Sequence, residues 1–219
     1  MICVKELSKT YYGKGVETQV LKKLNLRIEQ GEFVCILGKS GCGKTTLLNI
    51  LGLLDNATGG SYELDGIDVA GLSRSNLAKL RNKKFGFIFQ EYHLIPELNV
   101  VENVCVPLGY AGIGKKEREK VSLKLLEDLD LTEKVKKYPS QLSGGEKQRV
   151  AIARAIANNP AVILADEPTG SLDQKNGAIV MQTLRRLHEQ GVAVIMVTHD
   201  IVLSKYSTRI IEMEDGKII

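Results

Sequence analysis

Apolar and polar residues follow strand-like patterns through the first part of the chain. Residues 2–7 and 19–28 alternate apolar with polar side chains, and a Gln-Gly turn follows the second run. This pattern is typical of strands with one buried face. Residues 32–37 form a near-continuous apolar run, and a glycine-rich loop and a helical pattern over 45–54 come after it. The order of strand, loop and helix predicts an α/β protein.

The middle of the chain has a different texture. Residues 55–66 carry the glycines of another hairpin, and residues 84–90 (KFGFIFQ) read as a further buried strand. From about 101 to 158 the chain is rich in Lys, Glu, Leu and Ala with apolar spacings of three and four, which predicts helices. The elements expected after this helical section are a strand at 162–165, a helix at 174–190, a strand at 192–197 and a β segment at 209–219.

Composition narrows the class of protein. The 219 residues are 43% hydrophobic and 26% charged, which suits one globular unit, and the net charge of +4 is scattered, so we expect no nucleic-acid binding. No apolar run approaches the roughly 18 residues of a membrane span. The N-terminus lacks the pattern of a secretory leader, which favours a cytosolic location. The four cysteines form no CxxC pair, and we expect reduced thiols.

Residues 38–45 (GKSGCGKT) match the phosphate-loop pattern G-x-x-x-x-G-K-[ST] between a strand and a helix. Backbone amides in such a loop form an anion-binding nest, and the helix adds the positive end of its dipole. Lys44 would supply charge to the terminal phosphates, and Thr45 a hydroxyl to Mg²⁺. A flexible turn that binds nothing is the alternative, and the Lys-Thr ending argues against it. The residues expected to contact the nucleotide here are Gly38, Lys39, Ser40, Gly41, Cys42, Gly43, Lys44, Thr45 and Thr46.

Two carboxylates follow the apolar strand at 162–165. Asp166 and Glu167 would lie at the carboxyl end of a parallel strand, where open α/β sheets bind ligands. Asp166 is suited to hold Mg²⁺ through water, and Glu167 to polarise a water for attack on the γ-phosphate. The alternative is that both acids only cap a loop.

Residues 142–148 (LSGGEKQ) begin where a helix N-terminus is expected. Ser143 and the amides of Gly144 and Gly145 can face an anion there, although a Ser-Gly-Gly helix cap alone would need no ligand. With the phosphate loop and the Asp-Glu pair, this string makes the chain resemble the ATP-binding-cassette superfamily over essentially its whole length.

The resemblance implies further functional residues. It gives Gln90 a role in sensing Mg²⁺ and the attacking water, and it places Asp173, in the loop of Ser171 and Leu172, across a dimer interface. His199 matches the histidine that contacts the γ-phosphate, although a lone His at a strand end is more often structural. Tyr11 matches the aromatic residue that stacks on adenine, with Tyr12 left open as the alternative.

The resemblance also implies the architecture and the chemistry. Residues 1–219 would be a single cassette domain: a P-loop NTPase (RecA-like) core with an N-terminal antiparallel β subdomain (1–90 and 159–219) and an inserted α-helical lobe (91–158). Two copies would sandwich two ATP molecules, each held by 38–45 of one chain and 143–145 of the other. Catalysis would fall to Glu167, His199, Gln90 and Lys44, and the metal would be held by Thr45, Gln90 and Asp166.

Within the superfamily, the strings LGLLD, FIFQEYHLIPELNVVENV and ILADEPTGSLD look most like the lipoprotein-release and macrolide-export branch. That branch implies a separate transmembrane permease, a place on the cytoplasmic face of the cell membrane, and a lipoprotein, peptide or antibiotic as cargo. Residues 91–98 would dock the permease, although Leu94 and Leu98 suit core packing equally well. Glu146 stands where many relatives have Gln, outside the inferred phosphate contact.

Two alternatives to a transport ATPase stay open. One is a cassette ATPase with another task, such as cell division, regulation, translation or DNA repair. The other is a nucleotide-dependent switch that does not hydrolyse ATP. Glu167 separates the second from an ATPase, because a switch needs no general base.

Overall fold

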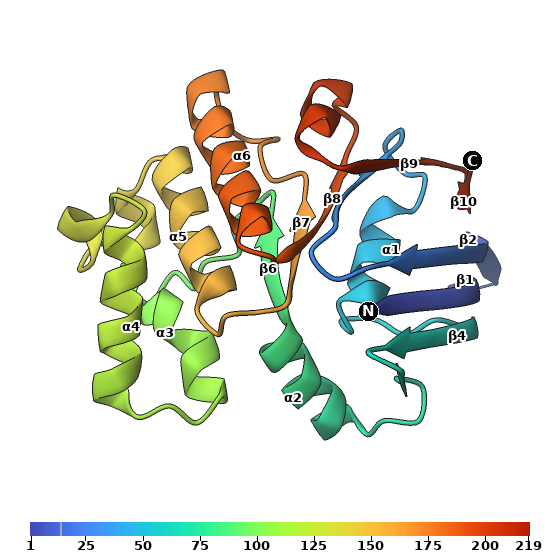
Figure 1. The fold of residues 1–219 in the computed structure, drawn as a ribbon, viewed down its shortest axis with the longest axis horizontal. Helices are drawn as coiled ribbons and strands as arrows, with labels where there is room; N and C mark the ends of the chain where they lie inside the picture. The colour runs from blue at the N-terminus through green and yellow to red at the C-terminus, as the bar shows by residue number, and fades with distance from the viewer. Residues whose placement is uncertain (14) are drawn as a thin grey trace. The chain divides into compact units, whose positions relative to one another are not determined.

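Antiparallel strands open the chain, as the alternating pattern predicts. The structure, a computed structural model, describes residues 1–13 and 15–219. Strand β1 (Ile2–Gly13) pairs with β2 (Val16–Ile28) on one side and β4 (Gly59–Leu64) on the other, and β5 (Ile67–Asp68) completes the order β2-β1-β4-β5 (Figure 1). Both opening strands are longer than the patterns indicate, because irregularities between Val4 and Thr10 let the pairing continue past breaks in the alternation.

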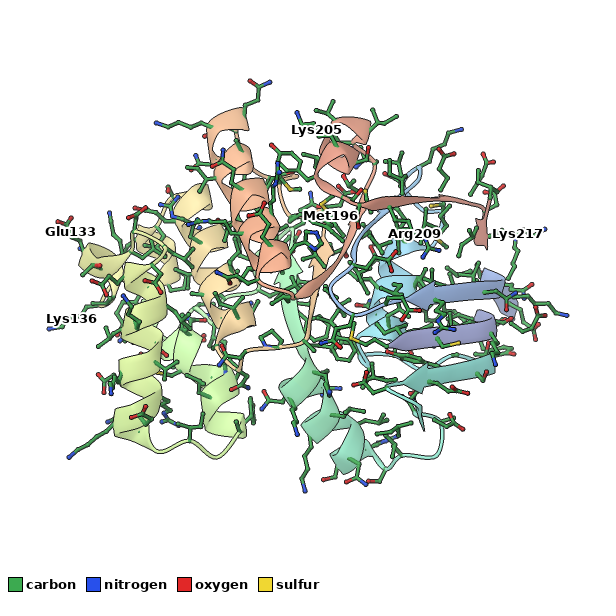
Figure 2. All side chains as sticks on the ribbon, viewed as in Figure 1. Glu133, Lys136, Met196, Lys205, Arg209 and Lys217 are labelled. Carbon is green, nitrogen blue, oxygen red and sulfur yellow. The ribbon has the colours of Figure 1, made fainter. Side chains whose placement is uncertain are left out.

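A second group of strands pairs mainly in parallel, and two of its strands are buried. Strand β3 (Phe33–Leu37) pairs in parallel with β8 (Ala193–Thr198) and with β9 (Arg209–Glu214), and β10 (Lys217–Ile218) returns antiparallel to β9. Every residue of β8 is buried, which fits a sequence that is apolar up to its last residue, Thr198. In Figure 2 Met196 lies within this strand, while Lys217 projects outward. Helix α1 (Lys44–Leu51) follows β3, one residue earlier than expected.

The predicted helical section consists of three helices that pack together. Figure 1 shows α3 (Val100–Tyr110), α4 (Lys115–Glu127) and α5 (Gly144–Ile156) side by side. Their buried faces recur at helical spacing, as in Val100, Val104 and Leu108 of α3. Short 3₁₀ segments connect α4 to α5 at Thr132–Lys134 and Pro139–Gln141, and another follows β8 at Ile201–Tyr206. The parallel strands β6 (Phe85–Phe89) and β7 (Val162–Asp166) pack with α5, and α6 (Gln174–Glu189) follows β7.

One helix has no counterpart in the predicted elements. Helix α2 (Arg74–Lys84) buries none of its residues fully, and its sequence RSNLAKLRNKK has only a weak apolar face. Its amphipathic signal is therefore too small to separate it from a polar loop. The structure thus adds a helix between the hairpin at 55–66 and the strand predicted at 84–90.

The chain divides into two compact units, one formed by Met1–Arg81 with Leu187–Ile219 and the other by Asn82–Arg186. The single-cassette division at residues 90 and 159 stays a prediction. Cys3, Cys42 and Cys105 are free thiols, as expected. Across residues 1–13 and 15–219, none of the helices has both the length and the apolar character that a membrane crossing demands.

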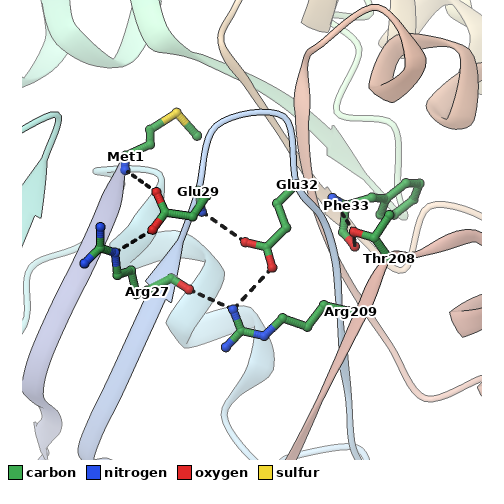
Figure 3. Close-up of polar contacts among 7 residues, drawn as sticks. All are labelled: Met1, Arg27, Glu29, Glu32, Phe33, Thr208 and Arg209. Carbon is green, nitrogen blue, oxygen red and sulfur yellow. Dashed lines mark hydrogen bonds and ion pairs between the residues drawn. The ribbon is translucent and has the colours of Figure 1, made fainter.

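The turn between β2 and β3 is fastened by a polar cluster in the first unit (Figure 3). The Glu29 carboxylate pairs with Arg27 and with the Met1 amino group, and the Glu29 amide donates to Glu32 Oε2 at 3.0 Å. Arg209 of β9 donates to Glu32 Oε1 at 3.2 Å and to the carbonyl of Arg27 at 3.0 Å. These contacts fix the entry into β3, the strand that leads to the phosphate loop.

Candidate nucleotide site

The phosphate loop has a backbone that only glycine allows. Gly41 and Gly43 adopt φ values of 82° and 104°, in the left-handed region that side chains disfavour. Gly38 is required for a different reason, because a Cβ there would overlap the carbonyl oxygen of Met213 and lie 2.8 Å from Cys42 Sγ. The pattern's glycines therefore match a tight, closely packed loop.

Lys44 lies inside this loop. It is 7% exposed, and its Nζ donates to the carbonyls of Gly38 at 2.7 Å and Lys39 at 2.9 Å. An ammonium has three N–H donors, and two hydrogen bonds of Lys44 go to carbonyls of the loop itself. Gly43 is the N-cap of α1 and provides no side-chain cap for the first-turn amides. An anion therefore suits this end of the helix, and Thr45, the second residue of α1, is exposed beside it.

His199 belongs to the same unit as the phosphate loop. It follows β8 directly, and Thr198, the residue before it, pairs with Leu37 in the parallel ladder. The Gly38 amide also donates to the Thr198 carbonyl at 3.3 Å. The predicted switch histidine and the start of the phosphate loop thus emerge from neighbouring strands at the same edge.

Tyr11 and Tyr12 differ in their surroundings. The Tyr11 hydroxyl donates to Asp55 Oδ2 at 2.9 Å, and Lys9 Nζ lies 4.7 Å from its ring centroid. Tyr11 is 43% exposed and Tyr12 71%. Tyr11 is therefore fixed in orientation with ring surface still accessible, and its assignment to adenine stays a prediction.

Gln90 and the Asp-Glu pair come together in the second unit. Phe89 pairs with Asp166 in the parallel ladder of β6 and β7, so Gln90 and Glu167 leave the sheet side by side. Glu167 has φ 44°, a strained value for a residue with a side chain, and its carbonyl accepts from the amide of Gly170 at 3.0 Å. A Cβ on Gly170 would lie only 2.9 Å from Gln90 Nε2. The Gln90 amide therefore packs directly on the turn that carries Glu167.

The start of α5 is a complete capping box. Ser143 Oγ accepts from the Glu146 amide at 3.3 Å, and Glu146 Oε2 accepts from the Ser143 amide at 2.7 Å. Lys134 pairs with the same carboxylate at 3.0 Å. The hydrogen bond from the Ser143 backbone, assisted by Lys134, lowers the pKa of Glu146. Glu146 is therefore occupied by the helix cap, and the hydroxyl proton of Ser143 remains to be donated.

Asp173 caps α6 in this structure. Its two carboxylate oxygens accept from the Asn176 amide and from Asn176 Nδ2, each at 2.8 Å. The backbone bond from Asn176 is the main cause that lowers the pKa of Asp173. The nucleotide role that the resemblance gives to Asp173 stays a prediction.

Three residues near these segments carry contacts that the sequence patterns miss. Gln148 is fully buried and donates to the Pro168 carbonyl at 2.7 Å. Arg154 donates to the carbonyls of Tyr92 (2.7 Å) and His93, and burial lowers its pKa to about 10, which leaves it charged at neutral pH. Gln148 and Arg154 are polar residues within the apolar helix sequence QRVAIARAI, and this pattern could have indicated that both have buried partners. No pattern in the sequence indicates the contacts of Tyr92, the third residue.

The predicted residues thus fall into two sets. The first unit holds Tyr11, Gly38, Lys39, Ser40, Gly41, Cys42, Gly43, Lys44, Thr45, Thr46 and His199, and the second holds Gln90, Ser143, Gly144, Gly145, Asp166, Glu167 and Asp173. Among the described residues no group of three or more His, Cys, Asp or Glu side chains is arranged to hold a metal by itself.

Two relatives among the known proteins differ in how much of their length this chain covers. The chain is 50% identical over 220 residues to the macrolide export ATP-binding/permease protein MacB of Aggregatibacter actinomycetemcomitans, covering 100% of this chain and 34% of that protein. The chain thus spans about a third of the length of such relatives. It is 52% identical over 209 residues to the uncharacterized ABC transporter ATP-binding protein MJ1508 of Methanocaldococcus jannaschii, covering 95% of this chain and 93% of that protein.

Solved structures of ABC transporter cassettes have the same fold as this chain. The dimeric structure of MJ0796, described as a bacterial ABC transporter cassette, has a TM-score of 0.93 at 46% identity and covers 100% of this chain and 96% of that one. A post-hydrolysis dimer of MJ0796 bound to ADP and Pi also has a TM-score of 0.93, at 45% identity, with the same coverage. Residues 21–170 match the sequence profile of the family described as ABC transporter. The chain belongs to the ABC transporter family, as an ATP-binding cassette.

Proposed function

We propose that this chain binds and hydrolyses ATP as a dimer and drives a membrane permease. The observation that carries the proposal is Lys44, a buried ammonium held inside a glycine loop by two loop carbonyls. Keeping a lysine there costs desolvation, which an anion in the loop would offset. The post-hydrolysis ADP and Pi of the MJ0796 dimer support ATP turnover as the reaction.

Each residue has a defined task in this proposal. Amides of the phosphate loop and Lys44 bind the phosphates, and His199 contacts the γ-phosphate. Glu167 has φ 44° and lies in the turn on which the Gln90 amide packs, and it accepts a proton from the attacking water. Ser143 of a second copy donates its hydroxyl to the same γ-phosphate, so loss of that phosphate weakens the dimer. ATP hydrolysis would in this way separate the two copies and move the permease.

Mg²⁺ fits the residues proposed to hold it. Thr45 offers a hydroxyl, Gln90 an amide and Asp166 a carboxylate, which are the hard oxygen donors that this ion prefers. Mg²⁺ usually takes one or two carboxylates and completes its coordination with phosphate oxygens and water, so a dedicated cluster of acids is not needed. The ion would neutralise charge on the phosphates, while Asp166 and Thr45 orient it.

The permease partner rests on the relatives. MacB proteins carry both an ATP-binding and a permease function in their names, which supports coupling to a permease. MJ1508 has nearly the length of this chain, which supports a cassette that acts with a separate permease. We place the protein on the cytoplasmic face of the cell membrane. Residues 91–98 are the segment proposed to dock the permease, and this segment contains the half-buried Leu94 and Leu98 and the 38% exposed Ile95. The cargo class is a lipoprotein, peptide or antibiotic.

Substitution of the proposed general base tests this function. We expect Glu167→Gln to abolish steady-state phosphate release while ATP still binds, so that a stable dimer elutes earlier in size exclusion with ATP and Mg²⁺. Glu119→Gln, an exposed carboxylate of α4, is the matched control and should behave as wild type. Wild-type hydrolysis by Glu167→Gln would refute the assignment. A wild-type chain that binds ATP and never releases phosphate would favour the non-hydrolysing switch.

A further inference from the structure

One hydroxyl of the second unit lies where three functional segments meet. The Tyr92 hydroxyl oxygen is 3.0 Å from Ser171 Oγ, in the loop that precedes Asp173. It is also 2.9 Å from the position that a Cβ on Gly144 would take, at the first residue of α5. Tyr92 itself stands two residues after Gln90. The turn after Gln90, the start of α5 and the loop before α6 therefore share this one contact point.

The direction of the hydrogen bonds follows from the atoms. Ser171 Oγ lies 3.0 Å from the Gln90 carbonyl, which can only accept, so Ser171 donates its single proton to it. The hydrogen bond between Ser171 and Tyr92 then takes its proton from the Tyr92 hydroxyl. The result is a short chain from Tyr92 through Ser171 to the backbone of Gln90.

The turn that carries Tyr92 is strained and externally held. Tyr92 and His93 have φ values of 62° and 46°, two left-handed residues in succession without a glycine. Such a conformation persists only where surrounding groups hold it. Arg154 of α5 donates to both of their carbonyls. The turn is thus fixed to α5 from its backbone side, and the Tyr92 side chain reaches the loop of Ser171.

Helix α5 also holds the turn after Glu167. Gln148, fully buried, donates to the Pro168 carbonyl at 2.7 Å, one residue beyond Glu167. Helix α5 is therefore hydrogen-bonded both to the turn after Gln90 and to the turn after Glu167. The hydrogen bond between Tyr92 and Ser171 joins these two turns directly to each other.

We propose that Tyr92 is a positioning residue: its hydroxyl, through Ser171, fixes the backbone of Gln90 relative to Glu167 and to the start of α5. This inference rests on the proposed function, because Gln90 and Glu167 are its catalytic groups. Catalytic groups must be held within a fraction of an ångström, and a hydroxyl pair between two loops adds that restraint without touching ATP.

Tyr92→Phe tests the proposal because it removes the hydroxyl and keeps the ring. We expect kcat for ATP hydrolysis to fall roughly threefold to tenfold, the size of one neutral hydrogen bond, with KM for ATP within about twofold. The phosphate loop is unchanged, which is why KM should hold. A role in packing alone predicts no change in kcat, since the ring remains. Tyr110→Phe, an 82% exposed tyrosine of α3, is the matched control and should match wild type.

A double-mutant cycle supplies the second readout. Ser171→Ala should lower kcat by a similar factor. The kcat of the double variant, Tyr92→Phe with Ser171→Ala, should lie within about twofold of the kcat of the slower single variant. Additive losses, an unchanged kcat in Tyr92→Phe, or a change confined to KM would each overturn the proposal.

The same assays on Glu167→Gln separate this inference from the function beneath it. If Glu167→Gln loses hydrolysis while Tyr92→Phe keeps the wild-type kcat, only the positioning role fails. If Glu167→Gln hydrolyses ATP like wild type, the proposed function fails whatever Tyr92→Phe does. Melting curves should place Tyr92→Phe within a few degrees of wild type, which excludes loss of fold as the cause of a lower kcat.

Discussion

Two helix N-termini in this protein are proposed to face phosphates, and they are built in opposite ways. Helix α1 begins after Gly43, which lies at φ 104° and offers no side-chain cap, and Lys44 is its first residue. Helix α5 begins after Ser143, with a complete capping box that involves Glu146. The start of α1 presents uncapped backbone amides and the Lys44 ammonium. At the start of α5 the capping box already satisfies part of the hydrogen bonding of the backbone amides.

The difference follows from what stabilises each helix. Helix α1 buries Leu47, Leu48, Ile50 and Leu51 within eight residues, so packing stabilises it without a cap. The start of α5 includes two glycines, which cost helix stability, and the capping box compensates for them. We infer that the α1 end is built to keep phosphates, whereas the α5 end keeps its shape without them and can release them when two copies separate.

The largest expected effect comes from a side chain placed inside the phosphate loop. A Cβ in Gly38→Ala would overlap the Met213 carbonyl, which is backbone and cannot move aside. We expect loss of ATP binding in a titration with a fluorescent analogue, and a stability loss of about 1–3 kcal/mol from overpacking. Gly71→Ala, at a glycine with open space around it, is the control. Wild-type affinity in Gly38→Ala would show that the loop does not form the site.

Ser143 tests whether the α5 end acts as a cap, as a phosphate donor, or as both. Ser143→Ala should cost about 1 kcal/mol in urea denaturation, because the bond from the Glu146 amide is lost, whereas Ser143→Asp should keep the cap and most of the stability. Hydrolysis should show the reverse order: both variants lose the donor, and the aspartate also repels the phosphates, so it should be the slower. Equal ATPase rates in Ser143→Asp and wild type would restrict Ser143 to capping.

The smallest expected effect concerns Glu146. The hydrogen bond from the Ser143 backbone holds the pKa of Glu146 below its usual value, so the contribution of this carboxylate to stability is complete above the unfolded pKa of about 4.3. That contribution is lost as pH falls through the lower folded value. Glu146→Gln keeps an acceptor for the Ser143 amide and loses the pair with Lys134, which is 38% exposed. We expect about 0.5 kcal/mol less stability at pH 7, and no difference near pH 3. A gap that persists in acid would show that charge is not its cause.

Prediction from sequence succeeds where the relevant contacts are local. The helix start expected at Ser143 is stabilised by a bond between residues only three positions apart, and the glycines of 38–45 permit the backbone angles of their own loop. Buried strands such as β3 and β8 appear within one or two residues of their apolar runs, since periodicity reports burial directly. Helix α2 fails this test because its apolar face is too weak to detect.

The amino-acid sequence alone decides that this chain is an α/β protein with a phosphate loop, a capped Ser-Gly-Gly helix start and an Asp-Glu strand end, because each is a short pattern with its own chemistry. Only the folded chain reveals that Ser171 meets Tyr92, 79 residues away, and that Arg154 reaches the Tyr92 carbonyl across 62. Contacts of this separation depend on how distant elements pack. No local periodicity or spacing encodes them.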